Sequence, residues 1–221
     1  MRVSSGCVNI DSFVRRLKRA LKKELLPSVS RVAKRRDPFK VLIACLISLR
    51  TKDDVTAESA RRLFSAAETP GEIVRLSESK IARLIYPAGF YRSKAKTIRR
   101  VCRDLLEKHG GVVPADLDSL LSLKGVGRKT ANLVVTKGFG KPGICVDTHV
   151  HRIVNRWGYV STRKPDDTEA ALRGKLPQRY WILLNDLLVT FGKKICTPVS
   201  PKCSQCPLDG DCPKINVAST R

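Results

Sequence analysis

Two glycines separated by one residue, Gly125 and Gly127, divide an apolar stretch in the middle of the chain. The apolar residues before the glycines are Leu120, Leu121 and Leu123. Those after them recur at helical spacing, at Ala131, Val134 and Val135. Because glycine adopts turn geometries that other residues resist, the pattern predicts a helix, a tight turn and a second helix.

Lys129 lies two residues beyond this turn. The start of a helix suits a phosphate group, because free backbone N–H groups and the positive end of the helix dipole lie there. We therefore expect Lys129 beside a nucleic-acid backbone, as a candidate nucleophile. A Gly-x-Gly pair alone is a weak signal, and most lysines in a first helical turn are only solvated. The interpretation thus depends on the rest of the chain.

The charge of the chain indicates a polyanionic partner. Its 221 residues carry a formal net charge of +23 and give a pI near 10.2, and nucleic acid is the leading candidate for such a balance. An anionic membrane surface is the alternative. The longest apolar run, residues 41–47, is far too short to span a bilayer, so we expect no membrane partner.

The N-terminal region is basic, with apolar residues at helical spacing. Over residues 8–26 these are Ile10, Phe13, Val14, Leu17, Leu21 and Leu25. A transit peptide has a similar composition, but Asp11 and Glu24 favour a packed amphipathic helix. Residues 1–6 lack the apolar core of a secretory signal. We expect a cytoplasmic, nucleoid-associated protein in a prokaryote, with a nucleus or an organelle as the alternatives.

Four cysteines lie close together near the C-terminus: Cys196, Cys203, Cys206 and Cys212, with six, two and five residues between them. Without an export signal, this density favours metal ligands over disulfides. Zinc is one candidate, although structural zinc sites commonly use two Cys-x2-Cys pairs and only one is present. The irregular spacing favours a [4Fe-4S] cluster. The other cysteines, Cys7, Cys45, Cys102 and Cys145, are scattered and read as buried free thiols.

The rest of the chain predicts helices, because sustained alternation of apolar and polar residues does not occur. We expect them over residues 38–49, 54–64, 72–76, 77–85, 93–109, from 117 to the glycine turn, after Asp147, and over 166–176 and 178–191. Pro87–Tyr91 is expected to be a loop, and Gly138–Gly143 is the best candidate for a domain boundary.

Three motifs in this order resemble the endonuclease III family of DNA glycosylases, within the helix-hairpin-helix superfamily. They are LKGVGRKTANLVV at 123–135, VDTHVHRIVNR at 146–156 and C-x6-C-x2-C-x5-C at 196–212. The match extends from about Pro38 to Cys212. It implies an all-α fold of two domains flanking a DNA cleft. Residues 31–141 would form a six-helix domain with the hairpin, and residues 1–30 with 142–221 a [4Fe-4S] cluster domain.

The resemblance also assigns roles to residues. It places the catalytic lysine at Lys129, the catalytic aspartate at Asp147 and the cluster ligands at the four C-terminal cysteines. The DNA-binding turn would comprise Gly125, Val126 and Gly127, and we expect Lys202 to contact phosphates. Since Asp147 immediately precedes a predicted helix, we expect it also to cap that helix.

This chain departs from the family pattern at two positions. Lys124 stands where proline is common before the first hairpin glycine. Arg50 stands where the family usually has a glutamine that fills the gap left by the flipped base, and arginine can donate to O6 and N7 of guanine. Phe90 falls where a second, apolar wedge residue is expected.

By resemblance, the expected partner of this monomer is double-stranded DNA with a damaged pyrimidine or an abasic site. The enzyme would remove oxidised pyrimidines and cut the strand at the resulting site. One alternative is a related Fe–S glycosylase for mismatched adenine or thymine or for another damaged base. The lack of Glu in residues 48–53 and the presence of Lys129 disfavour it. Another alternative, a non-catalytic Fe–S DNA-binding or electron-transfer protein, is disfavoured by Lys129 together with Asp147.

Overall fold

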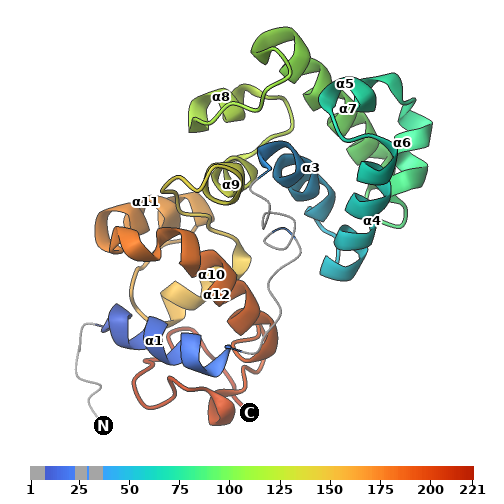
Figure 1. Cartoon of the computed structure of the whole chain (residues 1–221). Coiled ribbons are helices and arrows are strands. Elements are labelled where there is room, and N and C mark those ends of the chain that lie inside the picture. The colour runs from blue at the N-terminus through green and yellow to red at the C-terminus, as the bar shows by residue number, and fades with distance from the viewer. Residues whose placement is uncertain (1–7, 23–28, 30–36) are drawn as a thin grey trace. The chain divides into compact units, whose positions relative to one another are not determined.

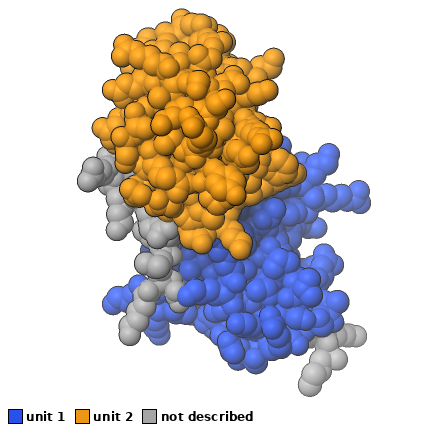
Figure 2. Space-filling model, turned by 90° about the vertical axis from the view of Figure 1, so that its right-hand side faces the viewer, with its two compact units in different colours: residues 1–26, 144–221 blue, residues 27–143 orange. Residues whose placement is uncertain are grey.

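The computed structural model describes residues 8–22, 29 and 37–221, and every regular element in these ranges is a helix (Figure 1). This confirms the all-α prediction. The chain divides into two compact units (Figure 2): unit 1 comprises residues 1–26 and 144–221, and unit 2 comprises residues 27–143. No helix in the described ranges combines the length and the apolar character needed to cross a bilayer.

Unit 2 contains a series of helices around one apolar helix. The elements are α3 (Pro38–Ser48), α4 (Asp53–Ala66), α5 (Pro70–Arg75), α6 (Glu78–Ile85), α7 (Tyr91–His109), α8 (Leu117–Ser122), α9 (Arg128–Leu133) and the π-helical turn η2 (Val134–Gly138). Eight of the eleven residues of α3 are buried hydrophobics. Because α3 is apolar on all sides, it packs against α4, α7, α9 and η2 together.

The helix starts of unit 2 follow capping rules that can be read in the sequence. The side chains of Asp37, Ser77 and Asp116 each accept a hydrogen bond from a backbone N–H three residues ahead. Thr69 and Glu72 form a reciprocal capping box at α5. At its C-terminus α7 ends on Gly110, which has φ of +60°. These local signals explain why the predicted helices lie close to the observed ones.

Unit 1 consists of α1 (Ile10–Ala20), α10 (Thr148–Arg156), α11 (Pro165–Lys175), the 3-10 turn η3 (Gln178–Tyr180), α12 (Trp181–Lys194) and the 3-10 turn η4 (Cys203–Gln205). The apolar face of α1 is buried, as predicted for an amphipathic helix. Phe13 of α1 meets Trp157 edge-on, with ring centroids 5.1 Å apart. Leu25 and Cys7, which entered the sequence-based predictions, lie outside the described residues.

Several details of the helices differ from the expectations. α7 begins at Tyr91, two residues before the predicted start and inside the segment expected to be a loop. The segment predicted as one helix over 178–191 begins with η3 and continues as α12 to Lys194. The helix after the glycine turn changes to π geometry at Val134 and ends on Gly138. A Cβ on Gly138 would lie 2.8 Å from the Cα of Pro38, so this glycine allows η2 to approach the start of α3.

The buried cysteines of unit 2 are part of its core. Cys45 on α3 and Cys102 on α7 are buried and unpaired, in agreement with the expectation of free thiols. Burial raises the pKa of each thiol to about 12. For Cys45 the nearby charge of Lys129 opposes this shift.

Substitution of Gly138 tests the contact between η2 and α3. Gly138→Ala forces a methyl group against the Pro38 backbone, and we expect it to lower the free energy of unfolding by about 1–3 kcal/mol. Gly174→Ala is the matched control, because Gly174 lies within α11 and a Cβ there meets nothing within 4 Å. This control should raise the stability by about 0.5–1 kcal/mol. Urea unfolding measures the free energy of unfolding of both variants. A Gly138→Ala protein as stable as the parent would contradict the close packing of η2 against α3.

Candidate functional site

The predicted turn between two helices is present in unit 2. α8 is followed by Leu123, whose carbonyl accepts a hydrogen bond from the Val126 N–H at 2.9 Å, and Gly127 is the N-cap of α9. Gly125 has φ of +107°, and a Cβ there would lie 2.6 Å from Cγ2 of Thr97 on α7. A glycine is therefore required at 125 both for its backbone conformation and for the close approach.

The three turn residues differ in what they offer a ligand. Val126 is only 5% exposed, so its side chain is buried and its backbone is the part left for a ligand. A Cβ at Gly127 would meet nothing within 4 Å, which leaves the start of α9 open to close approach. On the other side of the turn, Arg100 of α7 donates to the Lys124 carbonyl at 3.1 Å.

Lys129 and Asp147 each lie at the N-terminal end of a helix, but in different units. Lys129 is exposed in the first turn of α9. Asp147 is the N-cap of α10, and its Oδ1 accepts hydrogen bonds from the N–H groups of His149 and Val150, both at 2.9 Å. At 9% exposure this carboxylate is nearly enclosed. The capping role expected for Asp147 is thus confirmed.

Arg50 and Phe90 lie side by side although forty positions separate them in the sequence. The guanidinium carbon of Arg50 is 5.5 Å from the centroid of the Phe90 ring. Both residues have left-handed backbones, with φ of +52° and +56°, and Phe90 is 63% exposed. The two side chains line one cavity together with Gly125 of the turn. Unit 2 therefore brings both expected wedge residues to the same region as the turn.

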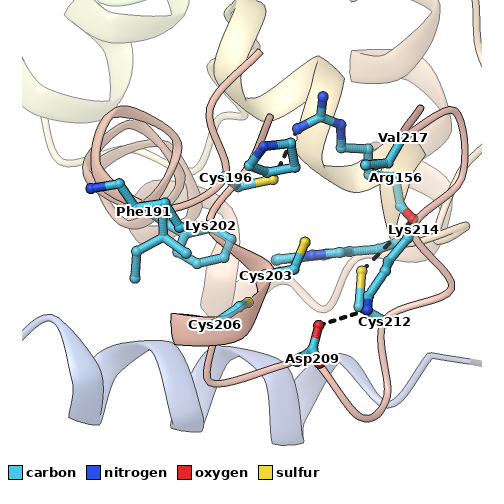
Figure 3. Close-up of a pocket in the computed structure, with 13 residues that line it drawn as sticks. Arg156, Phe191, Cys196, Lys202, Cys203, Cys206, Asp209, Cys212, Lys214 and Val217 are labelled. Atoms are coloured by element: carbon cyan, nitrogen blue, oxygen red, sulfur yellow. Dashed lines mark hydrogen bonds and ion pairs between the residues drawn. The ribbon is translucent and has the colours of Figure 1, made fainter. Parts of the chain in front are cut away.

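The four C-terminal cysteines of unit 1 line one pocket (Figure 3). All four are unpaired. Burial raises the pKa of Cys206 to about 11 and also raises the pKa of Cys203 and Cys212. Burial thus favours the protonated form of these three thiols, whereas coordination to a metal would remove the proton.

Two donors already point at sulfur atoms of this pocket. Arg156 Nη1 lies 3.4 Å from Cys196 Sγ, and the Leu208 N–H donates to Cys206 Sγ at 3.4 Å. Within the described ranges no group of three or more His, Cys, Asp or Glu side chains could hold a metal ion. The cysteines surround a space, which suits a group of several atoms better than one ion. Lys202, the expected phosphate contact, is half-buried and lines the same pocket.

Two buried basic residues of these sites were not predicted from the sequence. Arg156 holds the Cys196 segment, also donating to the carbonyls of Thr197 and Pro198, each at 2.7 Å. Lys94 of α7 is only 7% exposed. The burial of Lys94 could have been predicted from its spacing, because Lys94 lies on the same face of α7 as the apolar residues Ile98 and Val101.

Comparisons with known proteins identify the family. Residues 43–178 match the HhH-GPD superfamily base excision DNA repair protein. The chain is 45% identical to endonuclease III of Thermotoga maritima over 87% of this chain and 90% of that protein. It is 44% identical to endonuclease III homolog 1, chloroplastic, of Arabidopsis thaliana over 79% of this chain and 48% of the plant protein, so it spans about half of that relative.

A solved structure agrees with this relationship. The structure of a trapped endonuclease III–DNA covalent intermediate, an estranged-adenine complex, superposes with a TM-score of 0.82 at 33% identity, over 93% of this chain and 94% of that chain. The helical fold, the glycine turn and the sequence identity lead to one conclusion. The chain belongs to the endonuclease III family of the HhH-GPD superfamily, and it is a DNA glycosylase and AP lyase of base excision repair.

Proposed function

We propose that this enzyme removes oxidised pyrimidines from duplex DNA through a Schiff base on Lys129 and then cuts the strand by β-elimination. The observation that carries the proposal is the position of Lys129, exposed in the first turn of α9 directly after a glycine turn open to a phosphate backbone. The structurally similar endonuclease III forms a covalent intermediate with DNA that can be trapped, which supports a nucleophile in this chain as well.

The base must leave the helix before any reaction. Flipping a nucleotide costs a few kcal/mol, and the cost is smaller for a damaged base. An oxidised pyrimidine that has lost its aromaticity stacks poorly, which favours its selection. Arg50 and Phe90 hold the opened duplex, the arginine through hydrogen bonds to the opposite base and the phenylalanine as an apolar wedge. Their contact at 5.5 Å supports a joint role.

The chemistry begins when the neutral Lys129 amine attacks C1′ of the sugar. A C1′–N bond forms, the bond from C1′ to the base breaks, and the base leaves with the electron pair and takes up a proton. The C1′–O4′ bond then breaks, O4′ takes up a proton, and an imine remains between C1′ and Nζ of Lys129. This imine acidifies the C2′ proton. Loss of that proton expels the 3′ phosphate, which cuts the strand, and water then releases the sugar fragment from Lys129.

Asp147 stabilises the cationic sugar that develops as the base leaves. Its carboxylate is fixed by two backbone hydrogen bonds at the start of α10 and has little exposure. Both bonds fall on Oδ1 and hold the carboxylate in its capping position, which suits a fixed negative charge better than a group that takes up a proton. We therefore assign Asp147 an electrostatic role rather than proton abstraction.

The donor set at the C-terminus fits a [4Fe-4S] cluster held by Cys196, Cys203, Cys206 and Cys212. Four thiols around one pocket, with hydrogen-bond donors on two of the sulfurs, supply the ligands and the partners that such a group requires. The cluster would supply a structural crosslink. Unit 1 is accordingly the cluster domain and unit 2 the hairpin domain of a monomer, with Lys202 close to the DNA phosphates.

Lys129→Gln tests the nucleophile. We expect it to abolish borohydride trapping on a thymine glycol duplex and on an abasic duplex, because an amide cannot form the imine, while duplex binding survives. Lys80→Gln, an exposed change on α6, is the control and should trap normally. Trapping by Lys129→Gln would move the nucleophile elsewhere. Trapping of the parent on the abasic duplex alone would keep the lyase step and reject the oxidised pyrimidine as substrate.

Asp147→Asn tests the electrostatic assignment. The amide oxygen can still cap α10, but the negative charge is lost, so we expect single-turnover base release to fall about 100-fold or more. Asp116→Asn removes the charge of an equivalent cap on α8, whose carboxylate accepts from the Ser119 N–H at 2.8 Å, and should leave the rate near that of the parent. The assignment fails if Asp147→Asn retains most of the base-release rate.

Cys206→Ser tests the cluster. We expect the purified variant to lose most of its iron and acid-labile sulfide, since the alcohol is a poor ligand for this group. Cys102→Ala, which changes a buried thiol of unit 2, should retain both. Chemical analysis of iron and sulfide per protein tests the ligand role of Cys206 independently of activity. If Cys206→Ser contains as much iron and sulfide as the parent, Cys206 is not a ligand.

A further inference from the structure

A lysine in unit 2 has its ammonium group buried among oxygen atoms. Lys94 Nζ donates to the carbonyls of Ile47 and Leu49 at 2.6 and 2.5 Å and to Thr51 Oγ1 at 2.7 Å. An ammonium has three protons, so these acceptors satisfy it completely. Burial lowers the pKa of Lys94 to about 8. The group therefore remains largely protonated at neutral pH and can make all three bonds.

The three acceptors belong to the end of α3 and the loop that follows it. Ile47 lies in the last turn of α3, and Leu49 and Thr51 flank Arg50 on either side. Lys94 therefore holds the residue before Arg50 through its backbone carbonyl and the residue after Arg50 through its side-chain hydroxyl.

The same network reaches the loop of Phe90. Thr51 Oγ1 also accepts a hydrogen bond from the Gly89 N–H at 3.1 Å. A Cβ on Gly89 would lie 2.4 Å from the Arg50 carbonyl oxygen, so the two loops touch through their backbones. Lys94 is itself four residues beyond Phe90, and its N–H donates to the Phe90 carbonyl at 3.0 Å.

Both residues at the junction have strained backbones. Arg50 and Phe90 adopt left-handed conformations that non-glycine residues rarely take. Such conformations persist only where surrounding contacts impose them. The contacts around these two residues include the bonds of Lys94 and Thr51 and the close approach of Gly89.

We propose that Lys94 is a positioning residue for base flipping: its ammonium joins the loop of Arg50 to the loop of Phe90 and presents the two side chains as one wedge. The inference rests on the wedge role proposed above for Arg50 and Phe90. The inference adds that the buried ammonium group of Lys94 fixes the two loops that carry the wedge side chains.

Lys94→Met removes the ammonium and keeps an unbranched side chain. We expect it to lower single-turnover base release from a thymine glycol duplex by about tenfold or more, because opening a paired base costs a few kcal/mol that a displaced wedge no longer offsets. Strand cutting on a duplex with a preformed abasic site should stay within about twofold, since no base has to be extruded. A 2-aminopurine placed opposite the lesion should also lose its fluorescence rise on binding.

Arg99→Met is the matched control on the same helix. Arg99 Nε donates to the carbonyls of Val74 and Leu76 at 3.3 and 3.2 Å, so it anchors the end of α5 as Lys94 anchors the end of α3. It touches neither wedge loop in these bonds. Its loss should lower the stability without separating base release from strand cutting. If Lys94→Met does not fold, Thr51→Val removes the oxygen shared by both loops and should produce the same separation.

Phe90→Ala distinguishes failure of this inference from failure of the wedge assignment. We expect Phe90→Ala to slow base release, and Lys94→Met to add little when both changes are combined, because the two act as a unit. Unchanged base release in Phe90→Ala and in Arg50→Ala would overturn the wedge itself. If Phe90→Ala is slow but Lys94→Met is normal, or slows both reactions equally, or matches Arg99→Met, then Lys94 has no positioning role.

Discussion

The burial of α3 is the constraint on which the organisation of unit 2 depends. An apolar helix needs cover on every side, and α4, α7, α9 and η2 provide it. Three functional features follow from this packing. α9 brings Lys129 close to Cys45 of α3, the end of α3 leads directly into Arg50, and α7 meets both the Arg50 loop and the glycine turn through Lys94 and Thr97. The core thus determines where the reactive side chains lie.

The parts of the fold and of the site that depend on neighbouring residues could be predicted from the sequence. Caps such as Asp37 and Asp147, the stop at Gly110 and the turn at Gly125 each depend on a few neighbouring residues, and the structure places them as expected. The spacing of the C-terminal cysteines likewise anticipates their common pocket. What short sequence windows lack is information about contacts between distant segments.

The features that escaped prediction are of that second kind. The contact between Arg50 and Phe90 depends on two loops that meet at Gly89. The residues next to Arg50 and Phe90 in the sequence do not predict this contact. The burial of Lys94 depends on carbonyls more than forty positions away. The sequence marked 125–127 as a turn, but only packing decides that the Val126 side chain is enclosed while Gly127 stays open.

The buried thiols of the helical core can be used to measure whether the protein is folded. With a pKa of about 12, Cys45 and Cys102 hold almost no thiolate at neutral pH, and thiolate is the form that reacts with alkylating agents. Labelling of these two cysteines therefore reports opening of the fold. The C-terminal cysteines are partly exposed, so a reagent can reach them in folded protein although burial also raises the pKa of three of them. Their labelling reports the state of their pocket, so one reagent and a mass measurement follow the scaffold and the proposed cofactor site as separate signals.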